Sequence, residues 1–134
     1  MIEKTLSIIK PDAVERNLVD DIKSIFAKNN LSVKDNKKIH ISKEEASEFY
    51  KVHQSKPFYD ALCSYLSSGP IFVMILEGEN AISENRKIMG ATNPKDAEPN
   101  TIRKLYGISI DKNSVHGSDS LENAKKEINF FFKN

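Results

Sequence analysis

The run Asn113-Ser114-Val115-His116-Gly117-Ser118-Asp119-Ser120 is the most informative part of the chain, because a short strand passes directly into a capped helix there. Val115 and His116 form the predicted strand, and the serine and aspartate side chains after Gly117 are typical helix caps. A helix N-terminus supplies unpaired N–H groups and a positive potential. His116 is therefore suited to face an anion, although the local sequence supports a purely structural histidine equally well.

The helix that follows this run carries an apolar stripe and one carboxylate on the same side. The stripe consists of Leu121, Ala124, Ile128, Phe131 and Phe132. Glu127 lies three positions after Ala124 and four before Phe131, so it is predicted to point toward the core. A carboxylate in that position needs a partner. A lysine is one candidate partner, and the imidazole of His116 is the other.

The stretch of residues 90–117 shows little sustained periodicity and holds five of the ten glycines and prolines. A stretch of this length without regular structure inside a compact domain is usually functional. Two of the chain's three arginines, Arg86 and Arg103, flank residues 90–100. Their planar guanidinium groups suit bidentate contacts with phosphate. The same cationic, hydrogen-bonding pocket would include Lys10, Thr92 and Asn113.

The rest of the chain alternates strands and helices. Strands are predicted at residues 5–9, 31–41 and 71–76, and helices at 18–28, 43–53, 55–66 and 80–89. The odd-numbered apolar residues from Leu31 to Ile41 indicate a strand with one buried face. Ser42-Lys43-Glu44-Glu45 resembles a capping box. This order favours an α+β fold with a four-stranded, mostly antiparallel sheet and helices on one face; another α/β sandwich is the alternative.

Length and composition bound the class of protein. The 134 residues predict one domain that covers residues 1–134. A net charge of +1 excludes a strongly basic coat for nucleic acid and an acidic solvating tail. The single cysteine, Cys63, cannot form an internal disulfide, and the longest apolar run, Ile71 to Leu76, is too short to span a membrane. The N-terminus shows no signal-peptide pattern, so a cytoplasmic location is expected.

The remaining candidates for chemistry are weaker. His40 is predicted at the surface, and His53 is predicted as a satisfied imidazole at the edge of the core. The P-loop and dinucleotide-binding fingerprints are absent from the sequence. No carboxylate cluster marks a metal cage, so any Mg²⁺ is expected to arrive on phosphates rather than on protein ligands.

Taken together, the motifs of this chain resemble those of the nucleoside diphosphate kinase family, in order and over essentially the whole chain. The run of residues 113–120 is the most specific of them. The others are Lys10-Pro11-Asp12, Ser68-Gly69-Pro70, Gly90-Ala91-Thr92-Asn93-Pro94 and Thr101-Ile102-Arg103. The resemblance implies a ferredoxin-like βαββαβ sandwich with a long loop before the last strand, which agrees with the predicted element order.

The resemblance implies a chemistry for the predicted pocket. His116 would take the γ-phosphoryl group of a nucleoside triphosphate and hand it to a nucleoside diphosphate, with ping-pong kinetics. Glu127 would hold the imidazole, and Ser120 would support Glu127. The side chains implied to line the site around the phosphates and the ribose are Lys10, Tyr50, Arg86, Thr92, Arg103 and Asn113.

The resemblance also assigns the base-binding end of the site. Phe58 would stack on the base, with Leu62 and Ile110 beside it. Since every base has a π-face, broad base specificity is expected, and with it a role in maintaining pools of ribonucleoside and deoxyribonucleoside triphosphates. Phe58 and Leu62 also lie on the apolar stripe of their helix, which favours a core position when the family is left aside.

The resemblance further implies Mg²⁺ carried by the nucleotide and a homo-oligomer, with no membrane or specific nucleic-acid partner. The chain stops soon after its last predicted helix, as in short bacterial-type members. A hexamer or a tetramer is therefore expected, with a dimer as a further alternative. Asn17 and Asp21 stand where family members usually carry glycine, and Lys104-Leu105 replace a small residue and an aspartate. Two other classes remain as alternatives: an RNA-recognition module and a histidine phosphocarrier.

Overall fold

The computed structural model describes residues 1–110 and 112–132. In these residues, four strands form one antiparallel sheet in the order β2-β3-β1-β4. The strands are β1 (Ile2–Ile9), β2 (Ser32–Ile39), β3 (Ile71–Glu79) and β4 (Val115–Gly117). The predicted ferredoxin-like α+β fold is confirmed, and the apolar β3 is a central strand as expected.

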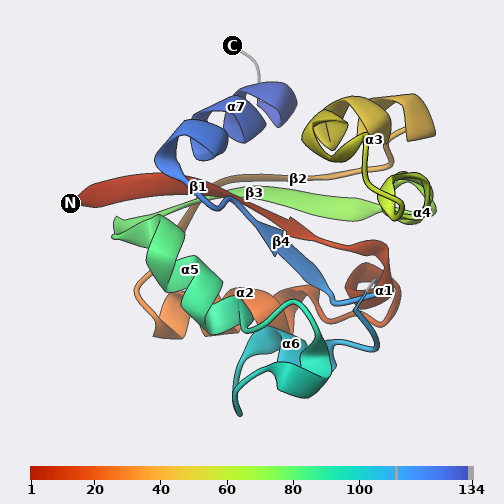
Figure 1. Cartoon of the computed structure of the whole chain (residues 1–134). Coiled ribbons are helices and arrows are strands. Elements are labelled where there is room, and N and C mark those ends of the chain that lie inside the picture. The colour runs from red at the N-terminus through yellow and green to blue at the C-terminus, as the bar shows by residue number, and fades with distance from the viewer. Residues whose placement is uncertain (111, 133–134) are drawn as a thin grey trace.

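Helices cover both faces of the sheet (Figure 1). On one face lie α3 (Lys43–Phe49), α4 (Tyr59–Leu66) and α7 (Leu121–Phe131). On the other lie α2 (Val19–Lys28), α5 (Ala81–Met89) and α6 (Ile102–Tyr106). The short elements are α1 (Pro11–Glu15) and two 3₁₀ turns, η1 (Lys51–His53) and η2 (Pro94–Asp96). The prediction that the helices lie on one face is therefore wrong.

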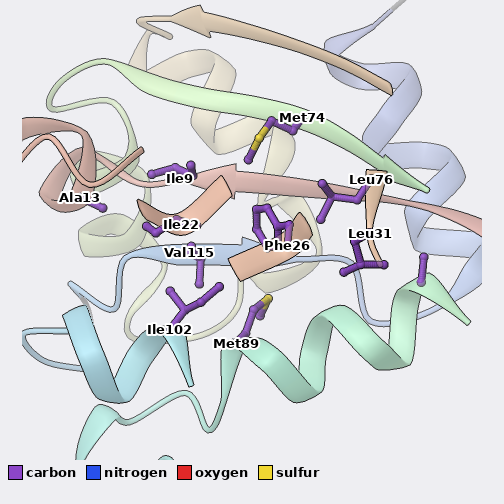
Figure 2. Packing of buried hydrophobic residues seen from close by; sticks show 11 residues of the cluster. Ile9, Ala13, Ile22, Phe26, Leu31, Met74, Leu76, Met89, Ile102 and Val115 are labelled. Carbon is purple, nitrogen blue, oxygen red and sulfur yellow. The ribbon is translucent and has the colours of Figure 1, made fainter. Parts of the chain in front are cut away.

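The reason is that β3 is apolar on both of its faces. Val73 packs in one buried cluster with helices α3, α4 and α7, whereas Met74 and Leu76 pack in a second cluster with α2 and α5. Each apolar face has to be covered, so each takes its own layer of helices. Figure 2 shows the second cluster, in which Met89 of α5 and Ile102 of α6 approach Val115 of β4. This packing holds α5 and α6 against the strand that carries His116.

Strand β2 departs from the single buried face that its parity pattern predicts. Lys34 is an extra residue in the ladder, because Val33 pairs with Leu76 while Asp35 pairs with Ile75. A bulge of one residue moves every later side chain to the opposite face. Val33 consequently packs in the second cluster and Ile39 in the first.

Local signals place most helix ends, with two differences. The capping box at Ser42 is present, since its side chain accepts from the backbone N–H of Glu45 and the Glu45 side chain accepts in return. Helix α4 begins at Tyr59 rather than at Ser55. The stretch 90–117, predicted without regular structure, contains η2 and α6. Asn17 replaces the family's glycine without difficulty, because its φ of 60° is a left-handed conformation that asparagine tolerates.

Candidate active site

A cavity of about 750 Å³ opens beside β4, between the α3–α4 segment and the loop that follows α5. It is the point where distant parts of the chain meet. Of the predicted site residues, those that line it are Lys10, Tyr50, Phe58, Leu62, Arg86, Thr92, Arg103, Ile110, Asn113, His116 and Glu127. Ser120 is absent from the lining. The fold therefore brings together nearly all side chains that the sequence singled out.

His116 lies in the middle of β4 and pairs with Glu127 from the second turn of α7. Its Nε2–H donates to Glu127 Oε1 at 2.8 Å, and about a fifth of each side chain is exposed. Of the two partners considered for Glu127, the structure selects the imidazole rather than a lysine. This hydrogen bond fixes the ring's orientation and its tautomer, with the proton on Nε2 and the lone pair on Nδ1.

The hydroxyl that supports Glu127 belongs to Ser118 and not to Ser120. Ser118 Oγ donates to the same Oε1 at 2.9 Å. Ser120 instead caps α7, where its hydroxyl accepts from the N–H of Asn123 at 3.1 Å. The implied role of Ser120 is thus corrected, and the physical reason is that α7 begins at Leu121 and uses Ser120 as its cap. Ser118 follows His116 by two positions in extended chain, so it projects to the same side as the imidazole.

Two aromatic rings border the imidazole. Phe49 stands edge-on to His116 with the ring centroids 5.3 Å apart, and Tyr50 stands edge-on at 6.3 Å. Burial, and secondarily the nearby Glu127 carboxylate, raises the pKa of Tyr50, so its hydroxyl stays protonated at neutral pH. Phe49 is not among the residues that the sequence singles out for the site; its position directly before Tyr50 was the available signal.

Arg103 is a buried cation in the wall of the cavity. Its side chain is in α6, is 8% exposed, and donates to the carbonyl oxygens of Gly90 at 3.0 Å and Val115 at 2.9 Å. Its Nε has no hydrogen-bond partner among the described residues. Burial, and then repulsion from Arg86, lowers the pKa of Arg103 to about 10. A desolvated cation beside a second cation favours an anion in the space between them.

Lys10 and Asn113 close the cavity on the side of β1. Lys10 Nζ donates to Asn113 Oδ1 at 2.9 Å, and both residues are buried. The amide nitrogen of Asn113 donates to the carbonyl oxygens of Thr92 at 3.1 Å and Ile110 at 3.0 Å. Asn113 thereby ties together Thr92 and Ile110, which lie far apart in the segment between α5 and β4.

The mouth of the cavity is apolar. Phe58 is 46% exposed and Ile110 is 54% exposed, although both are large apolar side chains. The centroids of the Phe58 and His53 rings are 5.9 Å apart. His53 differs from the satisfied imidazole predicted for it: its Nδ1 is buried without a hydrogen-bond partner in the described part of the chain, and the residue lines the cavity. The exposure of Phe58 excludes the core position that its helical stripe favours.

Two further properties concern metals and membranes. Within residues 1–110 and 112–132, no group of three or more His, Cys, Asp or Glu side chains is arranged to hold a metal ion. Of the described helices, none combines the length and the apolar character needed to cross a bilayer.

An imidazole held by a carboxylate, facing buried cations at one end of a cavity and an exposed aromatic ring at the other, defines a class of protein. The cations suit a polyphosphate, the ring suits a base, and the imidazole lies between them. Fold and site together are those of a nucleotide-binding phosphotransferase.

Comparison with known sequences identifies the family within this class. The profile described as nucleoside diphosphate kinase matches residues 3–134. A nucleoside diphosphate kinase of Nitratiruptor sp. is 56% identical over 131 residues, covering 98% of this chain and 96% of the relative. One from Nitrosococcus oceani is 54% identical over 133 residues, covering 99% and 93%.

Comparison with solved structures agrees. The nucleoside diphosphate kinase of Aquifex aeolicus superposes with a TM-score of 0.98 at 40% identity, covering 100% of this chain and 97% of that one. That of Halobacterium salinarum, solved in complex with CDP, gives 0.95 at 40% identity, covering 100% and 90%. The chain belongs to the nucleoside diphosphate kinase family and is a transferase that uses nucleotide substrates.

Proposed function

We propose that His116 carries a phosphoryl group between a nucleoside triphosphate and a nucleoside diphosphate, which occupy one cavity in turn. The observation that carries this proposal is the hydrogen bond from His116 Nε2 to Glu127 inside a cationic cavity. A covalent intermediate lets one site serve donor and acceptor in succession, so the kinetics are ping-pong. The cationic cavity around His116 favours this function over an RNA-recognition module or a phosphocarrier, because neither of those classes needs a complete triphosphate pocket.

The first half-reaction follows from the tautomer. The Nδ1 lone pair of neutral His116 attacks the γ-phosphorus, a P–N bond forms, and the P–O bond to the β-phosphate oxygen breaks. The electron pair leaves with the nucleoside diphosphate. The Nε2–H remains hydrogen-bonded to Glu127, whose negative charge stabilises the positive charge that develops on the ring. In the second half-reaction a β-phosphate oxygen of the acceptor attacks the same phosphorus and the P–N bond breaks.

The cations and amides of the cavity supply positioning and charge stabilisation, which are the main demands of phosphoryl transfer. Arg103 and Lys10 would face the transferring group, and Arg86 with Thr92 would face the β-phosphate. Lys10 and Asn113 would also reach the ribose hydroxyls. The burial of Arg103 and its lowered pKa support this placement, because phosphate would neutralise a charge that the protein has desolvated.

Phe58 would stack on the base, with Leu62 and Ile110 on either side. The exposure of Phe58 and Ile110 at the cavity mouth supports this assignment. Stacking reads the π-face rather than the hydrogen-bonding edge, so discrimination among bases is weak. Such an enzyme would serve the pools of ribonucleoside and deoxyribonucleoside triphosphates in the cytoplasm.

Mg²⁺ fits this site as a passenger on the nucleotide. The cavity wall supplies ammonium, guanidinium and amide groups, and its carboxylates do not form a metal-binding group among the described residues, whereas Mg²⁺ prefers phosphate oxygens and water. When bound, it would neutralise part of the phosphate charge. We also propose a homo-oligomer, a hexamer or a tetramer; the exposure of the large apolar side chains of Leu105 and Ile108 supports a covered surface there.

Initial rates measured against both substrates test the proposal. Double-reciprocal plots at several acceptor concentrations should give parallel lines. His116→Ala should abolish turnover, while His40→Gln should keep it, because His40 lies outside the cavity and contacts the carbonyl of Ser67. Converging lines, or turnover in His116→Ala, would contradict a histidine intermediate.

A further inference from the structure

A buried carboxylate that lies outside the cavity lining joins several segments of the site. Asp12 of α1 is 6% exposed and accepts hydrogen bonds from three side chains. Its Oδ2 accepts from Ser114 Oγ at 2.9 Å and from Arg16 at 3.0 Å, and its Oδ1 accepts from the Tyr65 hydroxyl. The Tyr65 oxygen in turn accepts from the backbone N–H of Asp12 at 2.9 Å. We call these four residues the Asp12 network.

Each member of the Asp12 network stands on a segment that also supplies the cavity. Asp12 follows Lys10 by two residues, and Ser114 directly follows Asn113. Tyr65 is on α4, the helix of Leu62. Arg16 also donates to the carbonyl of Tyr106, at the end of the helix that carries Arg103. The network therefore connects the segments of Lys10, Leu62, Arg103 and Asn113 through one carboxylate.

Ser114 shows why the connection is needed. Its φ of 74° is left-handed, a conformation that is strained for a residue with a Cβ. Its hydroxyl is bonded to Asp12, and its carbonyl oxygen accepts from the backbone N–H of Lys10 at 2.8 Å. This conformation sets the direction in which the chain leaves Asn113 and enters β4, two residues before His116.

We propose that Asp12, Tyr65 and Ser114 are positioning residues for phosphoryl transfer, holding Lys10 and Arg103 in register with His116. The inference rests on the proposed function. The hydrogen bond from Tyr65 to Asp12 persists at neutral pH, because burial and that hydrogen bond raise the pKa of Tyr65 and keep its hydroxyl a donor. Misplacing reacting groups by about 1 Å can cost on the order of 10²-fold in rate.

The test compares Tyr65→Phe with Tyr59→Phe. The Tyr59 hydroxyl donates to the carbonyl of Ser47 at 2.8 Å and lies outside the cavity, so both variants lose one partly buried hydroxyl on α4. We expect similar falls in Tm. Only Tyr65→Phe should slow single-turnover phosphorylation of His116 by ATP, by about tenfold, with the Kd for ADP changed less than about threefold. Ser114→Ala, which keeps the Cβ, should show the same split between rate and binding.

Wild-type phosphorylation rates in both Tyr65→Phe and Ser114→Ala, measured well below their Tm, would overturn the inference. An equal loss of rate in Tyr59→Phe would also overturn it, because the effect would then be general destabilisation. The proposed function fails separately, through the absence of phosphohistidine in the wild-type protein.

Discussion

At the scale of single residues, the chemistry depends on how Glu127 holds His116. The carboxylate accepts from one ring nitrogen, which in the proposed reaction would leave the other for phosphorus, and Ser118 bonds to the same carboxylate oxygen. Because α7 follows β4 directly in the chain, His116 and Glu127, eleven positions apart, come into contact through local structure. For this reason the pairing could be considered from the sequence, from the helical spacing of Glu127 and the position of His116 just before that helix.

Glu127→Gln tests that arrangement. The amide keeps the shape of the carboxylate but removes the charge that stabilises the developing imidazolium. We expect phosphorylation of His116 to slow by on the order of 10–10²-fold. Stopped-flow measurement of the first half-reaction checks this, with Glu122→Gln on the exposed side of the same helix as the control. Equal rates in both variants would show that Glu127 does not act on the ring.

Arg103→Ala tests the buried cation. It removes a charge-stabilising donor at the phosphate end, so kcat should fall by about 10²–10³-fold. The adjacent Lys104 is exposed, and its side chain donates to the loop carbonyl of Lys95, so Lys104→Ala should keep nearly full activity. Steady-state assays decide the matter. A loss below about threefold for Arg103→Ala would remove it from the transferring group.

At the same scale, two assignments were beyond sequence reasoning. Ser118 and Ser120 both follow His116 at even spacing, and only the start of α7 at Leu121 makes Ser120 a cap while Ser118 reaches Glu127. Phe49 is not singled out by the sequence, and its contact with His116 depends on how α3 packs over the sheet. Tertiary packing, rather than local pattern, decides both roles.

At the scale of elements, Gly117 controls how closely α5 approaches β4. A Cβ there would lie 2.4 Å from Asn85 Nδ2 and 2.6 Å from Met89 Sδ, both in α5. Asn85 is fully buried and adjacent in sequence to Arg86, so a shift of the helix moves Arg86 relative to His116. The glycine is therefore needed for close packing of the helix against the strand.

Gly117→Ala should lower the free energy of unfolding by about 1–3 kcal/mol through overpacking, and it should weaken ADP binding. Urea unfolding and calorimetric titration measure the two effects. Gly69→Ala is the matched control, because a Cβ there meets Pro11 at 3.6 Å, an ordinary contact. A stability loss in Gly69→Ala as large as that in Gly117→Ala would contradict the packing argument.

Element patterns failed where the backbone departs from regularity. The parity of Leu31, Val33 and Ile39 predicts one face, but the extra residue Lys34 inverts the second half of β2. A bulge leaves no mark in a hydrophobic pattern that remains periodic on both sides of it. Helix α6 was missed because five residues are too few to show a helical period, although Thr101 caps it through Lys104.

At the scale of the whole molecule, the sheet and its antiparallel order followed from the order of strong periodic segments. The placement of helices on both faces did not, because the apolar run at Ile71–Leu76 fits a strand buried on either one face or two. The position of the cavity came from the family's motifs rather than from periodicity. Both limits arise because one-dimensional patterns do not specify which layers cover a strand.

The stability at alkaline pH is expected to depend on the partly buried phenol of Tyr65. Burial raises the pKa of Tyr65, with Asp12 reinforcing the shift. The unfolded chain releases the Tyr65 proton near pH 10 while the native state retains it, so this contribution to stability falls as pH rises above about 10. Arg103, with its pKa lowered to about 10, acts in the opposite direction.

The difference between wild type and Tyr65→Phe isolates the phenol. Wild type should be more stable at pH 8, and its advantage should shrink as pH rises above about 10. Urea midpoints across this range provide the measurement, and Arg103 cancels because both proteins contain it. If the stability difference between wild type and Tyr65→Phe grew with pH, it would contradict the claim that native Tyr65 retains its proton.

The most direct test of a histidine intermediate is to isolate it and then discharge it. Incubation with γ-labelled ATP and Mg²⁺, followed by denaturing quench, should leave label on His116 that is labile in acid and stable in base. Unlabelled nucleoside diphosphate added before the quench should remove that label as nucleoside triphosphate. Turnover without any labelled protein, or label that no diphosphate can discharge, would contradict the account.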